Sequence, residues 1–477
     1  MTLHQEPLRR QRRYALYNFS FFSYAQYFLQ KPHIMSPVDS PPLRRYYNLM
    51  SNPLFTTLAG LKGNPRACIY TEPLWGLSMN LCIPYASVYM LALGLSDTQV
   101  GFIATIYMLS QVVFAFLSGP IADKMGRRKS TAVFDFIAWS VPSLIWWRAE
   151  NFWFFFVAAI LNGTMKVTAN SWNCLLIEDA EKKQITGIYS LAIVCGQFSA
   201  FFAPISSILV SRLTLVPAIR ILYINAFVLM TLKIIILFFA SKETHIGRMR
   251  LIETRDKNIF QLAGGYGGVI KIILHSRGTV FALAVTALTG IVGMINNTFW
   301  QVIVNKKLLV PDPMLPLFMV LRSVLAILFL FFVTPKLIKG LLKFPLLLGF
   351  ACYFAGQLLL ILVPIEGIFK YPLICLSLVF DGFGLGALTM LSESLIALHV
   401  NPDERARIMA ILYTIIMIVT APFGWIGGFL SDISRNLPFV LNLFMLAAGI
   451  SITYLYYIIN PDHSAELHEP ALNTEEL

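Results

Sequence analysis

The sequence predicts an all-α polytopic membrane protein with twelve transmembrane helices in two pseudo-symmetric six-helix bundles. Of its 477 residues, 57% are hydrophobic and only 13% are charged, and the mean hydropathy is +0.68. Soluble domains carry about 25% charged residues, so lipid must be the main solvent of this chain. A polar interval at about 241–277 also separates six apolar runs from six others.

Each of these runs is long enough, or nearly so, to cross the hydrocarbon core, which takes about 20 residues. They lie at 73–93, 98–121, 130–147, 152–176, 186–210, 217–240, 278–303, 313–334, 344–363, 371–398, 407–430 and 436–459. The predicted parts are a basic N-terminal segment (1–70), a first bundle (71–241), a middle loop (242–277), a second bundle (278–460) and a tail (461–477).

Basic residues are distributed unevenly between the two sides of the predicted membrane. Twelve crossings put both termini on one side, and 27 of the 37 Lys and Arg fall in the loops there, against six opposite. The positive-inside rule then places both termini and the middle loop in the cytoplasm. The net charge of +12 indicates loops that face anionic membrane lipids, not a nucleic-acid partner. We expect a monomeric, multi-pass protein of the cell membrane, plasma or inner.

The remaining composition excludes several classes of site. The six cysteines lack metal or disulfide spacing, and none of the seven His is paired within an apolar run. We therefore expect no metal, no cofactor and no enzymatic activity, with a lipid-modifying transferase as the alternative. The aromatic-rich stretch 14–30 is too short for a crossing and predicts an interfacial helix, unless the biological chain starts at Met50.

The two halves contain similar stretches. "LLIEDAEKKQITGIYS" (175–190) and "LHVNPDERARIMAILYT" (398–414) each join two helices through acid, then base, then Tyr. When they are superposed, Asp179 falls on Asp403 and Tyr189 on Tyr413. This pattern favours a duplicated architecture, as transporters with internal repeats have.

The loop after the second run, "SGPIADKMGRRKS" (118–130), places one acid and four bases in a short turn. It resembles the signature loop between helices 2 and 3 of major facilitator superfamily transporters, Gly-x-x-x-Asp-(Arg/Lys)-x-Gly-Arg-(Arg/Lys). The matching residues are Gly119, Asp123, Lys124, Gly126, Arg127 and Arg128. The resemblance covers about residues 70–460 and implies a transporter that works by alternating access.

Physical chemistry accounts for the residue types in this loop. Gly119 allows another helix to approach closely. Asp123 can accept hydrogen bonds from a helix N-terminus, which the family pattern implies is that of helix 11. Both arginines can pair with carboxylates at the end of helix 4, Glu178 and Asp179. We expect a conformational latch between the halves; a plain positive-inside turn is the alternative.

The resemblance also implies a cavity at the membrane midplane, lined mainly by helices 1, 4, 7 and 10. Charges inside a bilayer cost about 2.5–3.5 kcal/mol each on insertion scales, so they mark function by default. On helix 4, Asn162, Lys166 and Asn170 recur every four residues and form one polar stripe. Lys166 lies mid-span, and we expect it to face substrate or an acidic partner; a structural salt bridge is the alternative.

Further charges lie on helices 3, 8 and 10. Glu393 on helix 10 is deep enough to carry a proton through a transport cycle, and Asp381 lies on the same helix. Arg322 on helix 8 is either an anion-binding cation or the partner of an inward acid. Asp135 lies one to two turns into helix 3, where it could be a second gate residue.

Uncharged residues on helices 7 and 1 complete the candidate site. Asn296, Asn297 and Trp300 suit hydrogen bonding and stacking of a polar ligand, although Trp near an interface is also ordinary anchoring. Tyr85 and Tyr89 are spaced to share a face of helix 1. With two cations nearby, these groups suit an anionic or polyhydroxylated solute.

The sequence therefore predicts a secondary active transporter for a small solute. It contains no nucleotide-binding motif, so we expect an ion gradient, of protons first, to supply the energy. The expected substrate is an organic anion or a sugar-like molecule. Multidrug efflux and a lipid or lysolipid flippase on the same fold are the alternatives, since one fold hosts many functions.

Overall fold

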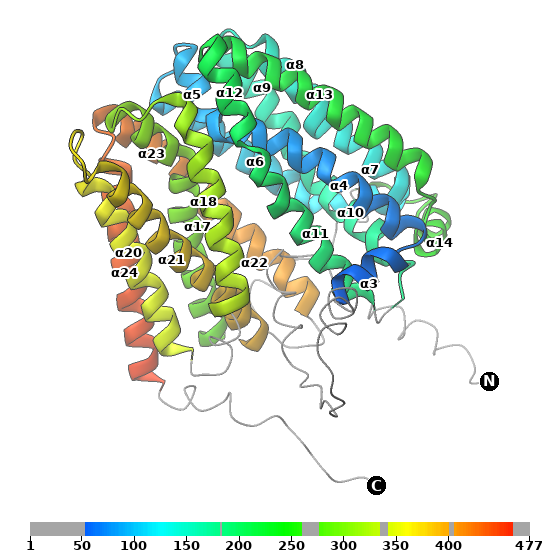
Figure 1. Ribbon diagram of the computed structural model, residues 1–477. Coiled ribbons are helices and arrows are strands. Elements are labelled where there is room, and N and C mark those ends of the chain that lie inside the picture. Colours follow the sequence, from blue (N-terminus) through cyan, green and yellow to red (C-terminus); the bar gives the residue numbers. More distant parts are fainter. Residues whose placement is uncertain (1–52, 182–183, 260–275, 334–341, 400–404, 461–477) are drawn as a thin grey trace, which may run out of the picture.

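The structure is a computed structural model that describes residues 53–181, 184–259, 276–333, 342–399 and 405–460. Within these ranges every regular element is a helix (Figure 1). We call residues 53–259 the first half and residues 276–460 the second half. The first half contains α3 (Pro53–Gly60), α4 (Gly63–Cys82), α5 (Ala86–Ala92), α6 (Asp97–Met125), α7 (Arg127–Asp135), α8 (Val141–Arg148), α9 (Phe152–Gly163), α10 (Met165–Ile177), α11 (Ile185–Ser199), α12 (Pro204–Leu213), α13 (Leu215–Ala240) and α14 (His245–Glu253). The second half contains α17 (Arg277–Val302), α18 (Leu315–Leu328), α20 (Lys343–Leu362), α21 (Lys370–His399), α22 (Arg405–Thr420), α23 (Pro422–Ile433) and α24 (Leu437–Ile459).

Nine helical segments of the described residues are long and apolar enough to cross a membrane. They coincide with the predicted runs except those at 73–93, 130–147 and 313–334. The described parts of these three are helical too, but short 3-10 or π turns interrupt or end them, at Ile83–Tyr85, Phe136–Ser140 and Phe329–Val333. The predicted all-α membrane fold class is therefore confirmed, whereas the count of twelve stays a prediction.

The first membrane-length helix begins earlier than the hydropathy indicated. α4 starts at Gly63, ten residues before the predicted run. Hydropathy missed its first turns because they carry polar side chains such as Asn64, which pack inside the first half. The predicted interfacial helix at 14–30, the tail at 461–477 and the repeat position Asp403 lie outside the described residues.

The two ends of the helical body differ in their connections (Figure 1). α3, α14 and the end of α24 lie at one end, which we call the proximal end. The loops after α5, α8 and α23 lie at the opposite, distal end. Helices of the first half gather on one side of the molecule, and those of the second half gather on the other.

In the part of the chain that the structure describes, buried apolar side chains form three clusters, and one of these joins the halves. At the distal end, Tyr223 of the first half and Phe299 of the second belong to the same core. At the proximal end each half has a core of its own, one around Leu176 and the other around Phe350. Apolar burial stabilises contact in proportion to area, so the halves are held together mainly at the distal end.

Glycines of the stretch "DGFGLG" (381–386) let α21 approach its neighbours in the second half closely. A Cβ on Gly384 would lie 2.5 Å from the backbone nitrogen of Tyr353, and one on Gly386 would lie 2.9 Å from the Phe329 ring. Small residues at such positions permit tight helix packing where no water can fill a gap. This packing fixes the helices that carry Tyr353 and Asp381.

Replacing Gly384 by Ala is expected to lower stability, because the added methyl group would overlap the Tyr353 backbone. Overpacking costs about 1–3 kcal/mol, and the better helix propensity of Ala returns about 1 kcal/mol of this. Gly382→Ala is the matched control, since a Cβ there meets only Leu325, at 3.6 Å. Thermal melting of both variants in detergent checks the prediction; equal melting temperatures would contradict it.

Candidate functional site

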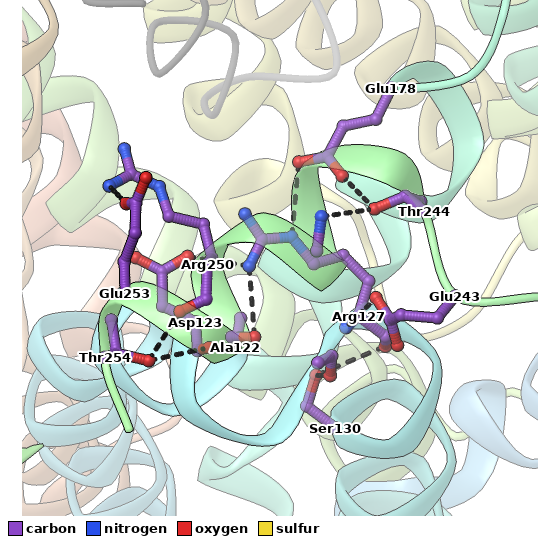
Figure 2. Close-up of polar contacts among 12 residues, drawn as sticks. Ala122, Asp123, Arg127, Ser130, Glu178, Glu243, Thr244, Arg250, Glu253 and Thr254 are labelled. Carbon is purple, nitrogen blue, oxygen red and sulfur yellow. Dashed lines mark hydrogen bonds and ion pairs between the residues drawn. The ribbon is translucent and has the colours of Figure 1, made fainter. Parts of the chain in front are cut away.

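Arg127, the first residue of α7, is the centre of a buried polar cluster at the proximal end (Figure 2). Its guanidinium donates to the Asp123 carboxylate at 2.6 Å, to Glu178 at 3.2 Å and to the Ala122 carbonyl at 3.0 Å. Charge-assisted bonds of this kind are among the strongest hydrogen bonds in proteins. The side chain therefore ties the end of α6 to the end of α10.

Glu243, just after α13, caps the N-terminus of α7. Its two carboxylate oxygens accept hydrogen bonds from the backbone N–H groups of Arg127 at 2.8 Å and Arg128 at 3.0 Å. A carboxylate is stabilising there because it faces unpaired N–H groups and the positive end of the helix dipole. Gly126 makes room: its φ is +83°, and a Cβ on it would lie 2.6 Å from Glu243. The sequence did not single out Glu243.

The acids at the end of α10 hold α14 and α4. Glu178 accepts a hydrogen bond from the Thr244 hydroxyl at 2.5 Å. Asp179 accepts from the backbone N–H of His245 and from the Asn64 amide, both at 3.2 Å. The expected pairing of an arginine with the end of this helix is thus present for Glu178, whereas Asp179 binds neutral donors.

The segment that follows α14 folds back onto α6. The Lys124 ammonium donates to the carbonyl of Lys257 at 2.6 Å. The Thr254 hydroxyl donates to the carbonyl of Asp123 at 3.2 Å (Figure 2). Both contacts lie within the first half. The loop therefore consolidates one half in this conformation.

Three expectations for the loop at 118–130 differ from the structure. The Asp123 carboxylate is held by Arg127 of its own half instead of a helix N-terminus of the second half. Among the described residues the Arg128 guanidinium pairs with no acid: it donates to the Phe238 carbonyl at 2.8 Å and lies 4.0 Å from the centroid of the Phe238 ring, within the first half. A Cβ on Gly119 would meet nothing within 4 Å. The outcomes for Asp123 and Gly119 have a common reason, since the two halves have separate cores at this end.

At the distal end, a second carboxylate caps a helix across the boundary between the halves. Asp432 on α23 accepts hydrogen bonds from the N–H groups of Asp97 at 3.0 Å and Thr98 at 2.9 Å, and from the Thr98 hydroxyl. In return, Asp97 is 2% exposed and accepts from the Ser431 hydroxyl at 2.5 Å. Its carboxylate also lies 3.5 Å from the Arg435 guanidinium. We call these five residues the distal latch.

Close packing of α6 on α23 continues below the distal latch. A Cβ on Gly101 would overlap the Gly424 carbonyl. One turn further, the Thr105 hydroxyl donates to the Ala421 carbonyl at 2.7 Å and accepts from the Trp425 N–H at 2.9 Å. The crossing therefore closes the distal end between the halves.

In the interior of the second half, Asp381 is the centre of a polar network. It is 4% exposed and accepts hydrogen bonds from the Gln357 amide at 3.0 Å and the Asn296 amide at 3.5 Å. Gln357 accepts from Asn442 at 2.9 Å, and Asn296 also donates to the Tyr353 hydroxyl at 3.3 Å. Two predicted site residues, Asp381 and Asn296, are thus brought together with three others.

Arg322 and Trp300 lie beside this network. The guanidinium is 4.4 Å from the centroid of the Trp300 ring, a cation–π geometry, and the charge of Asp381 acts on it. The Arg322 Nη2 and Trp300 Nε1 atoms are buried, and within the described ranges neither has a hydrogen-bond partner. Asn297, in contrast, is exposed on the same helix as Trp300. The arrangement offers two unused N–H donors.

Lys166 is half-buried near the middle of the α9–α10 segment. Among the described residues no carboxylate, that of Glu393 included, lies within ion-pair distance of it in this conformation. Glu393 instead accepts a hydrogen bond from the Tyr413 hydroxyl. Asn170 is half-buried on α10. Lys166 is therefore a cation without an acidic partner among these residues.

Three predicted ligand residues have structural roles instead. Asn162 donates to the Ala138 carbonyl at 2.6 Å, inside the π turn of the preceding segment. Tyr85 is fully buried in the distal core. Tyr89 is buried there too and donates to the Trp146 carbonyl at 3.0 Å. Spacing along a helix identified their common face, but that face packs into protein.

Asp135 is buried in the first half, where it pairs with Lys233 at 3.2 Å. Lys233 and the nearby Glu72 were not among the predicted site residues. The sequence signal that could have identified them is a charged side chain within or at the edge of an apolar run.

Comparison with known proteins shows which family the chain resembles. The sequence model of the Major Facilitator Superfamily matches residues 74–299. The resemblance to the major facilitator superfamily is confirmed. Over 131 residues the chain is 27% identical to the "Uncharacterized MFS-type transporter YqjV" of Bacillus subtilis (strain 168); this match covers 27% of the chain and 32% of that protein. The matched stretch thus spans about a third of the length of that relative.

Solved structures of transporters share the fold. The nucleoside transporter NupG aligns with a TM-score of 0.65 at 11% identity, covering 83% of this chain and 99% of that one. A D-xylose–proton symporter aligns with a TM-score of 0.61 at 14% identity, covering 82% of this chain and 96% of that one. At such identities the likeness is one of fold alone.

Replacing Asp432 by Ala is expected to open the distal end. Loss of a helix-capping acceptor costs about 0.5–2 kcal/mol, and here that cost falls only on the conformation in which the halves meet. A single cysteine at Ile103, buried in the distal core, should then react faster with a membrane-impermeant maleimide in a variant without the six native cysteines.

Arg148→Ala is the control for this experiment. It breaks an exposed ion pair with Glu150, 3.6 Å long, in the loop after α8 at the distal end. We expect no change in labelling of Ile103→Cys from this variant. Equal labelling rates in the Asp432→Ala and Arg148→Ala backgrounds would refute the role of the distal latch.

Proposed function

We propose that the chain is a secondary active transporter that moves a small organic anion by alternating access. The observation that carries this proposal is the asymmetry of the cores: one core joins the halves at the distal end, and separate cores lie at the proximal end. Two bodies in contact at one end can rock about a site between them, as transporters with repeated halves do.

Orientation and span count belong to the same proposal. The nine apolar segments and the three interrupted ones make twelve crossings, six in each half. The excess of Lys and Arg in the loops at the proximal end puts that end in the cytoplasm of a cell membrane, with both termini inside. The present conformation then faces inward, and the distal latch is its closed outer gate. A monomer suffices for this cycle, and no enzymatic step is part of it.

The unpaired cations support an anionic substrate. A buried charge without a partner is costly in the membrane, and Lys166 has no acidic partner among the described residues. In the second half, Arg322 and Trp300 each have an N–H donor without a hydrogen-bond partner among the described residues. An anion between the halves would satisfy these groups, and a planar one could also stack on an aromatic ring.

Protons are the proposed coupling ion. Acids within membrane segments are typical of proton relays, and the interior of the second half holds two buried ones, Glu393 and Asp381. One of the structural neighbours is named a proton symporter, which supports the proposal only through the shared fold. Movement of an anion together with protons would also offset charge transfer across the membrane.

Lys166→Ala is expected to abolish stabilisation by the substrate. Purified wild-type protein is screened by thermal shift against organic anions, sugars, cationic drugs and lysolipids at two pH values. A hydrogen bond to a charged group contributes about 1.5–3 kcal/mol, so the variant should bind an anionic hit at least about tenfold more weakly. The exposed Lys62→Ala is the matched control.

The pattern of hits separates the candidate functions. An anion that stabilises wild type and Lys62→Ala, but not Lys166→Ala, supports the proposal. Stabilisation by lysolipids alone would favour the flippase, and stabilisation by cationic drugs alone would favour drug efflux. Uptake of the hit into proteoliposomes, with and without a pH gradient, then tests transport itself.

We also propose that the Arg127 cluster becomes a latch to the second half when the proximal end closes. Asp123→Asn should then impair uptake of the screened ligand while the protein still inserts and folds, because the amide keeps the shape but loses the charge that holds Arg127. Glu253→Gln, which changes the exposed Arg250–Glu253 pair of α14, is the control. Wild-type uptake kinetics in Asp123→Asn would count against the latch.

A further inference from the structure

Three charged side chains meet inside the first half, away from the residues assigned to substrate. The Lys233 ammonium on α13 donates to the Asp135 carboxylate on α7 at 3.2 Å and lies 3.7 Å from the Glu72 carboxylate on α4. The side chains of Lys233 and Asp135 are 4% and 1% exposed, and that of Glu72 is 15% exposed. We call these three residues the buried triad.

The charges of the buried triad do not balance. Two carboxylates share one ammonium, so the ionised group has a net charge of −1 in a low-dielectric interior. Two thiols of the same proximal core, those of Cys68 and Cys195, lie near these charges. A thiol is ordinarily neutral at physiological pH, so neither compensates the excess charge.

A salt bridge with a purely structural role would need only one acid beside Lys233, so Glu72 would be unnecessary. A buried ion pair rarely stabilises a protein more than apolar residues of the same volume do, and an extra uncompensated carboxylate adds a penalty. Gln in place of Glu72 would fill the same space without that penalty. The presence of a second acid therefore indicates a group whose charge changes during function.

We propose that the buried triad is a proton-binding site in which Glu72 accepts the proton. Uptake converts the Glu72 carboxylate to a neutral carboxylic acid and leaves Lys233 paired with Asp135, so the site becomes neutral. Glu72 is the acceptor for two geometric reasons: it is the most exposed of the three, and the lysine N–H is bonded to Asp135. A metal cation does not suit the same place, because the ammonium already lies between the carboxylates.

The helices of the buried triad also carry the polar contacts at the proximal end. A change in the triad can therefore affect the end at which the halves have separate cores. α4 carries Asn64 two turns before Glu72, and α7 carries Arg127 two turns before Asp135. α13 carries Lys233 and, one turn on, Phe238, whose carbonyl accepts from Arg128. Neutral Glu72 no longer attracts Lys233, so α4 is held less tightly to α13. The role of the buried triad as the coupling site of the transporter rests on the proposed function. Proton binding by the triad does not.

Infrared difference spectroscopy of the purified full-length protein tests the site without any substrate. Lowering the pH should produce the C=O stretching band of a protonated carboxyl in wild type. Glu72→Gln should lose the component of that band that Glu72 contributes, and Asp135→Asn should change this component, because removal of the second acid leaves a balanced Lys233–Glu72 pair. Glu150→Gln, at an exposed carboxylate, should leave the buried band unchanged. Gel filtration and melting establish that each variant is folded.

Two results would overturn the proposal. The first is a protonated-carboxyl band in Glu72→Gln that is identical to the wild-type band, which would place the proton elsewhere. The second is loss of the band at fixed pH on addition of sodium, which would make the site one for a metal cation. Failure of the ligand screen or of uptake would leave this spectroscopic result intact and would count against the proposed function alone.

The coupling role has its own readout. Spectroscopic labels at the proximal ends of α6 and α22 report the separation of the halves, which should change with pH in wild type and not in Glu72→Gln. A pH-dependent separation that is the same in both proteins would refute coupling through the buried triad. Wild-type separation that is constant with pH, with the infrared band present, would refute it as well.

Discussion

The absence of water from the hydrocarbon core is the constraint on which this structure depends. Every backbone N–H and C=O at membrane depth must find a partner inside the protein, which accounts for the all-helical architecture of the described residues. The same constraint leaves the first N–H groups of each helix as the main unsatisfied donors. Two carboxylates of this protein answer that need, since Glu243 caps α7 and Asp432 caps α6.

These two caps differ in what they connect. Glu243 and α7 belong to the same half, so their contact can persist while the halves move. Asp432 and α6 belong to different halves, so their contact must break whenever the distal end opens. A carboxylate on a helix N-terminus is favourable but worth only about 0.3–2 kcal/mol. That range suits a gate, because a much stronger contact would trap the protein in one state.

Much of the fold could be predicted from the sequence, because hydropathy reports burial in lipid directly. Nine of the predicted runs correspond to apolar helical segments, and the family resemblance rested on one loop. Individual site residues could be predicted only in part. Asp381, Asn296, Arg322 and Trp300 were each singled out, and the structure brings them together. The pairing of Asp97 with Asp432, 335 positions apart, was not visible. One sequence contains no information on which remote side chains meet, so Lys233 and Glu243 were missed.

Tyr85, Tyr89 and Asn162 illustrate the opposite limit. Helical periodicity identifies which residues share a face, but it does not distinguish a face toward a ligand from one toward a neighbouring helix. Polar groups on a packed face then bond to the backbone, as Tyr89 does to Trp146. Only the packing partners decide between the two cases.

The π turn at Phe136–Ser140 has a consequence for how this helix can be engineered or can diverge. A π turn holds one residue more than the corresponding α-helical turn, and it separates α7, with Asp135, from α8. Removal of one residue there would restore regular α geometry with little rotation of α7 relative to α8, whereas regular α geometry with the residue kept would rotate them by about 100°. The wide turn thus sets the rotational phase between the two ends of one membrane segment. With it, Asp135 faces Lys233 while the distal end of the same helix keeps its own packing.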